Sequence, residues 1–166
     1  DDILLTTDYV ANGSFASLKE NVNYDYEPSY AILLRLTDFK SGWDGDYVYV
    51  DQKGYDFLKK SKVVPGDIII SNVGAYAGTV FLAPDFTKPM TLGPNSVLLR
   101  VKKKDFDQQY IYYYLSSYYG QAQLNSIITG SAQPKFNKTD LRTLIIPLPD
   151  YDVQKKVSLT LASVDN

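Results

Sequence analysis

The chain has 166 residues, of which 45% are hydrophobic, and this suffices for the core of one globular domain. It contains neither cysteine nor histidine, which excludes disulfides, Cys/His zinc sites and Ser/His or Cys/His nucleophilic pairs. No apolar run approaches the roughly 20 residues that span a bilayer, and the first residues do not have the pattern of a secretory signal. We therefore expect a cytoplasmic protein with no membrane partner.

The net charge of -2 conceals a strong asymmetry along the chain. Residues 1–57 hold four Lys/Arg and 11 Asp/Glu, whereas residues 58–142 hold 11 Lys/Arg and five Asp/Glu. A basic region favours a nucleic-acid partner only if its cations share one surface. A solvated face is the commoner origin of such a charge block, so charge alone leaves the partner open.

The first 100 residues favour strands over helices. They contain short runs rich in Tyr and β-branched residues, which are separated by Gly, Pro, Asn and Asp. The spacing of apolar residues within 54–63 predicts one short helix, and the following VPGD predicts a turn that leads into the next strand. The predicted strands cover residues 30–36, 47–51, 66–73, 78–83 and 95–101.

Residues 107–128 carry apolar side chains, many of them Tyr, at the spacing of a helix with a broad buried face. Asp107 suits the N-cap of this helix, and Gly120 within it indicates close packing or a kink. Tyrosines at this spacing most often belong to a core, and stacking on nucleic-acid bases is the alternative. We therefore predict one long, largely buried helix here.

The stretch TGSAQPKFNKTDLRTLIIPLP, residues 129–149, begins as a polar loop and ends as an apolar run bracketed by prolines. Asn137 or Thr139 can cap a short helix over KTDLR, and TLIIPLP predicts a buried strand. Residues 150–166 then predict the start of an amphipathic helix. Its apolar positions are Val153, Val157, Leu161 and Val164.

Motifs for catalysis or cofactor binding are weak in this chain. Glycines in SNVGAYAG, residues 71–78, follow a predicted strand, but the strand-like TVFLAP comes next and favours a hairpin turn. Asp51 and Lys53 have the acid-x-Lys spacing of metal-dependent nucleases, and Asp44 with Asp46 could hold a cation. Strand ends and solvated turns explain these pairs more simply. We expect no enzyme activity, no cofactor and no metal site.

The order of several segments resembles a known family. VPGDIIIS, a Gly-containing turn, NSVLLR, the YIYYYL helix and GSAQPKFNKTDL are followed by L-IIPLP and by Gln154, which opens a helix. This order resembles that of the target recognition domain of type I restriction-modification specificity subunits. TTDYVANGSFASLKENV at the start extends the similarity, more loosely, over essentially the whole chain.

The resemblance implies an α+β fold: a largely antiparallel β portion first, followed by a mixed α/β portion with the Tyr-rich helix. It also implies that residues 1–150 form a DNA target recognition domain and that residues 151–166 are the truncated start of a spacer helix. Such a domain reads one half of a bipartite double-stranded DNA target. Separate modification (methyltransferase) and restriction subunits carry out methylation and cleavage. A second recognition domain, or a second copy of the chain, is a further expected partner.

The resemblance also directs attention to basic and polar loop residues. Lys and Arg contact phosphates and position a protein on DNA, whereas contacts with base edges provide sequence preference. Phosphate contact is expected first of Lys135 and Lys138, ahead of Lys88 and residues 102–104. A solvated loop residue, a turn or a helix cap is the alternative for each candidate. Base readout is expected of Asn72, Tyr76, Ser131 and Gln133, followed by Arg35 and Lys40.

Three hypotheses follow from the sequence. The first is a non-catalytic, sequence-specific DNA-binding domain of a type I restriction-modification complex. The second is a protein-interaction module that assembles a complex through its terminal helix and binds little DNA of its own. The third is a small enzyme with an unrecognised carboxylate site. Salt-dependent DNA binding would separate the first two, and turnover by the purified chain would support the third.

Overall fold

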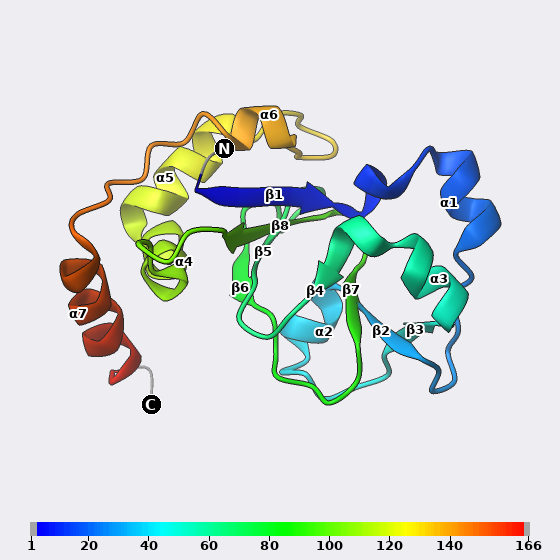
Figure 1. The fold of residues 1–166 in the computed structure, drawn as a ribbon. Coiled ribbons are helices and arrows are strands. Elements are labelled where there is room, and N and C mark those ends of the chain that lie inside the picture. Colours follow the sequence, from blue (N-terminus) through cyan, green and yellow to red (C-terminus); the bar gives the residue numbers. More distant parts are fainter. Residues whose placement is uncertain (1–2, 165–166) are drawn as a thin grey trace.

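The computed structural model describes residues 3–164 and arranges them as two four-stranded sheets between helices (Figure 1). Sheet A has the strand order β1-β8-β5-β6 with antiparallel pairing throughout. Sheet B has the order β3-β2-β7-β4, in which β2 and β7 run parallel. The strands are β1 (Leu4–Asp8), β2 (Ala31–Leu34), β3 (Val48–Val50), β4 (Lys62–Val63), β5 (Ile68–Ser71), β6 (Val80–Leu82), β7 (Met90–Leu92) and β8 (Ser96–Val101). The expected α+β fold is confirmed.

Helices cover the outer face of each sheet, and none of them, within residues 3–164, has both the length and the apolar composition needed to cross a membrane. The α-helices are α1 (Phe15–Asn21), α2 (Leu36–Lys40), α3 (Gln52–Phe57), α4 (Gln108–Ser116), α5 (Tyr118–Ile127), α6 (Lys138–Leu141) and α7 (Tyr151–Ala162), and the 3-10 helices are η1 (Tyr9–Asn12) and η2 (Lys59–Ser61).

The alternation of side chains along the strands produces three cores. In β5, Ile69 packs between the two sheets, whereas Ile68 and Ile70 pack with residues of α4, α5 and α6. In β2, Leu34 faces sheet A, and Leu33 packs with residues of α1 on the outer side. The layers are therefore helices, sheet A, sheet B and helices, and both sheets are buried on both faces.

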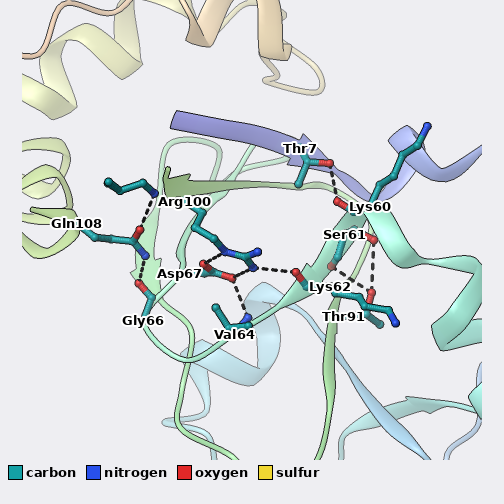
Figure 2. Close-up of polar contacts among 11 residues, drawn as sticks. Thr7, Lys60, Ser61, Lys62, Val64, Gly66, Asp67, Thr91, Arg100 and Gln108 are labelled. Atoms are coloured by element: carbon teal, nitrogen blue, oxygen red, sulfur yellow. Dashed lines mark hydrogen bonds and ion pairs between the residues drawn. The ribbon is translucent and has the colours of Figure 1, made fainter. Parts of the chain in front are cut away.

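A polar network ties the two sheets together at the turn before β5 (Figure 2). Asp67 is fully buried, and its carboxylate accepts hydrogen bonds from the Val64 N–H at 2.8 Å and from Arg100 Nε at 2.7 Å. Arg100 belongs to β8 of sheet A, and its guanidinium also donates to the carbonyl of Lys62 in β4 of sheet B at 3.0 Å. The predicted VPGD turn is confirmed by the 3.1 Å bond from the Asp67 N–H to the Val64 carbonyl.

The predicted single helix over residues 107–128 is wrong, because the chain forms two helices that break at Ser117. Ser117 caps α5 by accepting a 3.3 Å hydrogen bond from the Gly120 N–H. Gly120 is buried, and a Cβ there would lie 2.1 Å from the carbonyl oxygen of Tyr114. The glycine therefore allows α5 to cross the end of α4 closely. Asp107 is confirmed as the N-cap of α4, 2.8 Å from the Tyr110 N–H.

The predicted buried strand in TLIIPLP is also wrong. Within the described residues, this segment pairs with no strand, and the Ile145 side chain is 77% exposed. The Ile145 N–H donates to Gln123 Oε1 at 2.8 Å, and the Ile145 carbonyl accepts from Gln123 Nε2 at 2.9 Å and from the Tyr114 hydroxyl at 3.2 Å. Side chains of α4 and α5 thus replace a neighbouring strand. Asn137 is confirmed as the cap of α6, 2.9 Å from the Asp140 N–H.

The predicted terminal helix is confirmed as α7, but it is oriented differently from a simple amphipathic packing helix. Gln154 and Ser158 are its buried residues. The apolar positions Val153, Val157, Leu161 and Val164 are 36–77% exposed. In Figure 1, α7 stands at the edge of the molecule beside α4 and far from sheet B. The domain therefore covers these apolar side chains only in part.

Candidate nucleic-acid interface

Several loops meet at one end of sheet A. The register pairs Asp8 at the end of β1 with Val97, and Ser71 at the end of β5 with Ser96 at the start of β8. The loops that follow β1 and β5 and the turn that precedes β8 consequently lie together. The loop between α5 and α6 lies beside the same end of β1 (Figure 1). Loops on a rigid sheet are common locations for binding residues.

The loop between α5 and α6, residues 128–137, closes on itself. Thr129 and Lys135 exchange two backbone hydrogen bonds, of 2.9 and 2.8 Å. Gly130 has a φ of 91°, and a Cβ there would lie 2.9 Å from the Gln133 carbonyl oxygen. Glycine suits this left-handed, crowded position. The tight turn leaves the side chains of Ser131, Gln133 and Lys135 exposed.

This closed loop is fastened to the β5–β6 loop, residues 72–79. The Gly74 N–H donates to the Pro134 carbonyl at 2.8 Å. Asn72 binds Phe136 twice, since the Asn72 carbonyl accepts from the Phe136 N–H and the Asn72 Nδ2 donates to the Phe136 carbonyl, both at 3.1 Å. Phe136 itself is buried in the core beside α5. The two loops therefore form one surface with a defined shape.

Lys40 and Tyr76 extend this surface toward sheet B. The Lys40 ammonium at the end of α2 lies 3.3 Å from the centroid of the Tyr76 ring in the β5–β6 loop. A hydrogen bond with Lys40, reinforced by its positive charge, lowers the pKa of the Tyr76 hydroxyl. Tyr76 is 54% exposed, so the pair offers an aromatic edge and a cation to a ligand.

Three of the predicted site residues are held by internal contacts. Lys138 Nζ lies 2.8 Å from Asp8 Oδ1, and Arg35 lies 2.6 Å from Asp38 while also donating to the Asp46 carbonyl at 2.9 Å. Asn72 is occupied with Phe136, although its Oδ1 is buried without a hydrogen-bond partner in the described part of the chain. Asn72 and Lys138 thus hold the loops at the end of sheet A, whereas Arg35 holds the start of α2.

The remaining predicted cations lie elsewhere. Lys88 donates to the carbonyl of Ser29 at 2.9 Å, in the segment that precedes β2. Residues 102–104 follow β8 at the end of sheet A that is opposite to Ser96. Neither group is brought together with the loops at residues 72–79 and 128–137. The basic middle of the sequence is thus distributed over different surfaces.

The sequence reasoning missed an open groove of about 760 Å³ beside the β5–β6 loop. Its lining includes the aromatic residues Tyr9, Phe15 and Tyr24, together with Asn72 and Asn95. Burial raises the pKa of Tyr9, as does its hydrogen bond with Tyr24. Phe15 is 82% exposed at the rim. An exposed aromatic residue in TTDYVANGSFASLKENV was the available signal, but the sequence does not show that this segment faces the loops.

The acidic pairs considered for metal binding have structural explanations. Asp51 caps α3 by accepting a 2.7 Å hydrogen bond from the Gly54 N–H, which accounts for its position two residues before Lys53. Asp44 and Asp46 are exposed in the loop after α2. Within residues 3–164, no group of three or more acidic side chains is arranged to hold a metal ion.

The family model of type I restriction modification DNA specificity domains matches residues 9–166. The chain belongs to this family. The specificity domain is also 29% identical over 122 residues to the putative type I restriction enzyme MjaX specificity subunit of Methanocaldococcus jannaschii. That match covers 71% of the chain and 28% of the relative.

A second relative is the type I restriction enzyme MjaVIII specificity subunit of the same organism, which is 29% identical over 104 residues. This match covers 61% of the chain and 24% of the relative. The specificity domain thus spans about a quarter of the length of these curated relatives.

Solved structures show the same fold. The S subunit of the type I restriction-modification system from M. genitalium aligns with a TM-score of 0.56 at 15% identity, covering 99% of the specificity domain and 40% of that chain. The HsdS subunit from Thermoanaerobacter tengcongensis aligns with a TM-score of 0.56 at 20% identity, covering 98% and 37%. The family model confirms the family that the order of sequence segments indicated, and the solved structures confirm the fold.

Proposed function

We propose that residues 1–150 form a domain that reads one half of a bipartite double-stranded DNA target. The observation that carries this proposal is the fastening of the 128–137 loop to the 72–79 loop, which presents Ser131, Gln133 and Lys135 on one surface. Amide and hydroxyl side chains can bond base edges, while an ammonium group contacts phosphate. Membership of a family of DNA specificity domains supports DNA as the ligand of this surface.

The eight candidate residues divide into two roles in this proposal. Residues with exposed side chains contact DNA directly, with Lys135 on phosphate. The partly buried residues hold the loops, because their polar groups already have partners within the chain. Direct contact is proposed for Lys40, Tyr76, Ser131, Gln133 and Lys135, and support is proposed for Arg35, Asn72 and Lys138.

The domain is proposed to act without chemistry of its own and without a cofactor. Methylation would belong to a modification subunit and cleavage to a restriction subunit, in the cytoplasm where the DNA lies. Residues 151–166 would begin a spacer helix that pairs with the helix of a second recognition domain or a second copy. The exposed apolar stripe of Val153, Val157 and Leu161 supports such a pairing, because apolar surface favours burial.

Fluorescence anisotropy with DNA duplexes tests the proposal. A pool with randomised central positions would first be selected for binding, and an enriched duplex would then be titrated at several salt concentrations. We expect affinity to fall steeply with salt, and Lys135→Ala to reduce the slope of log affinity against log salt by about one. Lys103→Ala is the matched control, because Lys103 lies at the opposite end of sheet A.

Two results would count against this reading. One is a selection that enriches no sequence even at low salt, and the other is an equal effect of the two Lys variants on the salt slope. The first result, obtained for a subunit with both recognition domains present, would remove DNA reading from this chain. The second would leave DNA binding intact but move it away from the 128–137 loop.

The second candidate function is assembly of a complex through α7, with little DNA binding. The exposed stripe on α7 is the observation that favours it. The substitution Val157→Lys separates the two functions, since it places a charge in the stripe, far from the loops of sheet A. DNA reading predicts unchanged half-site affinity and weakened self-association, whereas pure assembly predicts no selective DNA affinity in either protein.

A further inference from the structure

The joint between the domain body and the terminal helix is made of hydrogen bonds. Gln154, in the first turns of α7, is 1% exposed. Its Oε1 accepts from the Asp107 N–H at 3.0 Å, and its Nε2 donates to the Pro149 carbonyl at 2.6 Å. Both ends of one amide side chain are therefore engaged, one with the start of α4 and the other with the segment that leads into α7.

Asp107 binds α7 a second time through its side chain. The carboxylate lies 2.9 Å from Lys155 Nζ while it caps α4 through the Tyr110 N–H. Helix α4 is itself anchored in the core by Ile111 and Leu115, each 1% exposed. The position of α4 is therefore fixed relative to sheet A. Contacts between Asp107 and α7 accordingly hold α7 in a defined orientation relative to the body of the domain, residues 3–150.

Tyr110 of α4 also bonds the segment that leads into α7. The Tyr110 hydroxyl donates to the Pro147 carbonyl at 3.0 Å, in the segment just before the helix. Ser158, one turn after Gln154, is 2% exposed against the body, whereas Val157 is 36% exposed. The inward face of α7 is thus polar. Hydrogen bonds require defined distances and angles, while apolar contacts allow sliding, so a polar joint specifies direction more narrowly.

We propose that Gln154 is a positioning residue that sets the direction in which α7 leaves the body, with Lys155 as its support. The positioning role of Gln154 depends only on the fold. Its effect on target choice rests on the proposed function, in which the direction of the spacer helix sets the separation and relative rotation of the two half-sites that a complete subunit reads. A residue that touches no DNA then contributes to which bipartite targets are accepted.

Pulsed electron–electron double resonance, which measures the distance between two spin labels, tests the direction of α7. The chain has no cysteine, so spin labels attach only at introduced positions, for example Ala122→Cys in α5 and Thr160→Cys in α7. Thr160 lies about 9 Å beyond Gln154 along the helix axis, so a swing of about 20° moves it by about 3 Å. We expect a single narrow distance distribution in the labelled parent and a distribution broadened by about 3 Å or more in Gln154→Leu.

Two further variants make the test specific. Lys155→Met removes the ion pair and keeps Gln154, so we expect a smaller broadening than in Gln154→Leu. Lys156→Ala, at an exposed neighbouring position, is the matched control and should leave the distribution unchanged. Circular dichroism would establish that α7 is helical in each variant. If Gln154→Leu does not fold, Lys155→Met provides the decisive comparison with Lys156→Ala.

A parent-like distance distribution in folded Gln154→Leu and in Lys155→Met would overturn the proposal. So would equal broadening in Lys155→Met and Lys156→Ala. In a complete specificity subunit, Gln154→Leu should widen the range of spacer lengths between methylated half-sites without changing the half-site sequence. If the parent subunit showed no sequence-selective DNA binding, the proposed function would be refuted but the distance measurements would still test the role of Gln154. Failure of the proposed function and failure of this proposal are therefore distinguishable.

Discussion

Replacing Arg100 with Met removes the guanidinium that neutralises Asp67 and links the two sheets. Asp67 is fully buried, and its carboxylate would keep the hydrogen bond from the Val64 N–H. Removing one partner of a buried ion pair costs about 3–5 kcal/mol. The Arg100 side chain is 31% exposed, so water can approach the carboxylate once the arginine is gone. We therefore expect the lower end, a loss of about 3 kcal/mol in the free energy of unfolding.

Urea denaturation followed by fluorescence measures this loss. The chain has a single tryptophan, Trp43, which packs against the core between the sheets and reports on their separation. With a dependence of about 2 kcal/mol per molar urea, the midpoint should fall by about 1.5 M. The double variant Asp67→Leu, Arg100→Met leaves no buried charge, so its loss should be smaller than the sum of the single losses. Additive losses would refute the reasoning, as would a midpoint shift below about 0.3 M for Arg100→Met.

Three smaller predictions concern other contacts. Burial raises the pKa of Asp107, but the bonds from Lys155 and the Tyr110 N–H bring it below its ordinary value, so this stabilisation is complete above about pH 4 and is lost as pH falls through the lowered folded pKa. Urea titrations between pH 5 and 2.5 should show a smaller loss for Asp107→Asn than for the parent, and equal losses would contradict this. Asn137→Ala should lower the free energy of unfolding by about 1 kcal/mol through loss of the α6 cap, whereas Asn125→Ala, outside any cap, should not. Lys40→Met should raise the Tyr76 ionisation midpoint toward its ordinary value in a difference titration against a Tyr76→Phe background, and an unchanged midpoint would exclude the Lys40 contact.

The strands that sequence predicted and those that it missed differ in how local their signals are. β5 and β6 form a hairpin whose glycines, Gly74 and Gly78, have φ of 97° and 93°, so the turn was readable from neighbouring residues. β1 pairs with β8 at the far end of the β portion, in a register that aligns Leu4 with Val101. β7 has only three residues, between Pro89 and Gly93, and its pairing with β2 is not visible from neighbouring residues. Such pairings depend on the whole fold.

The two errors after residue 100 have a common cause. Apolar composition suggested burial, but side-chain hydrogen bonds determined the outcome at Ser117 and at Ile145. A serine cap ends the run of helical residues, and Gln123 replaces a strand partner for Ile145. These contacts join residues far apart in the sequence or compete with helix continuation. Periodicity does not encode them.

The candidate site was predictable as chemistry more than as geometry. Loop composition correctly placed Ser131, Gln133 and Lys135 on an exposed turn, because Gly and Pro mark such turns. It did not predict that Lys138 pairs with Asp8, 130 positions earlier, since that contact requires the loop to cross the end of β1. Residue identity therefore identified the polar candidates, and the fold separated those with exposed side chains from those with partners within the chain.

The central claim is that this domain reads DNA sequence for a type I restriction-modification complex. The most direct measurement exchanges residues 1–150 for the corresponding domain of a specificity subunit with a different target, adds the modification subunit, and maps methylated sites by sequencing. The account predicts that one half of the methylated target changes to match the new domain, while the other half and the methylation chemistry stay the same. Methylation at unchanged sites after the exchange would contradict it.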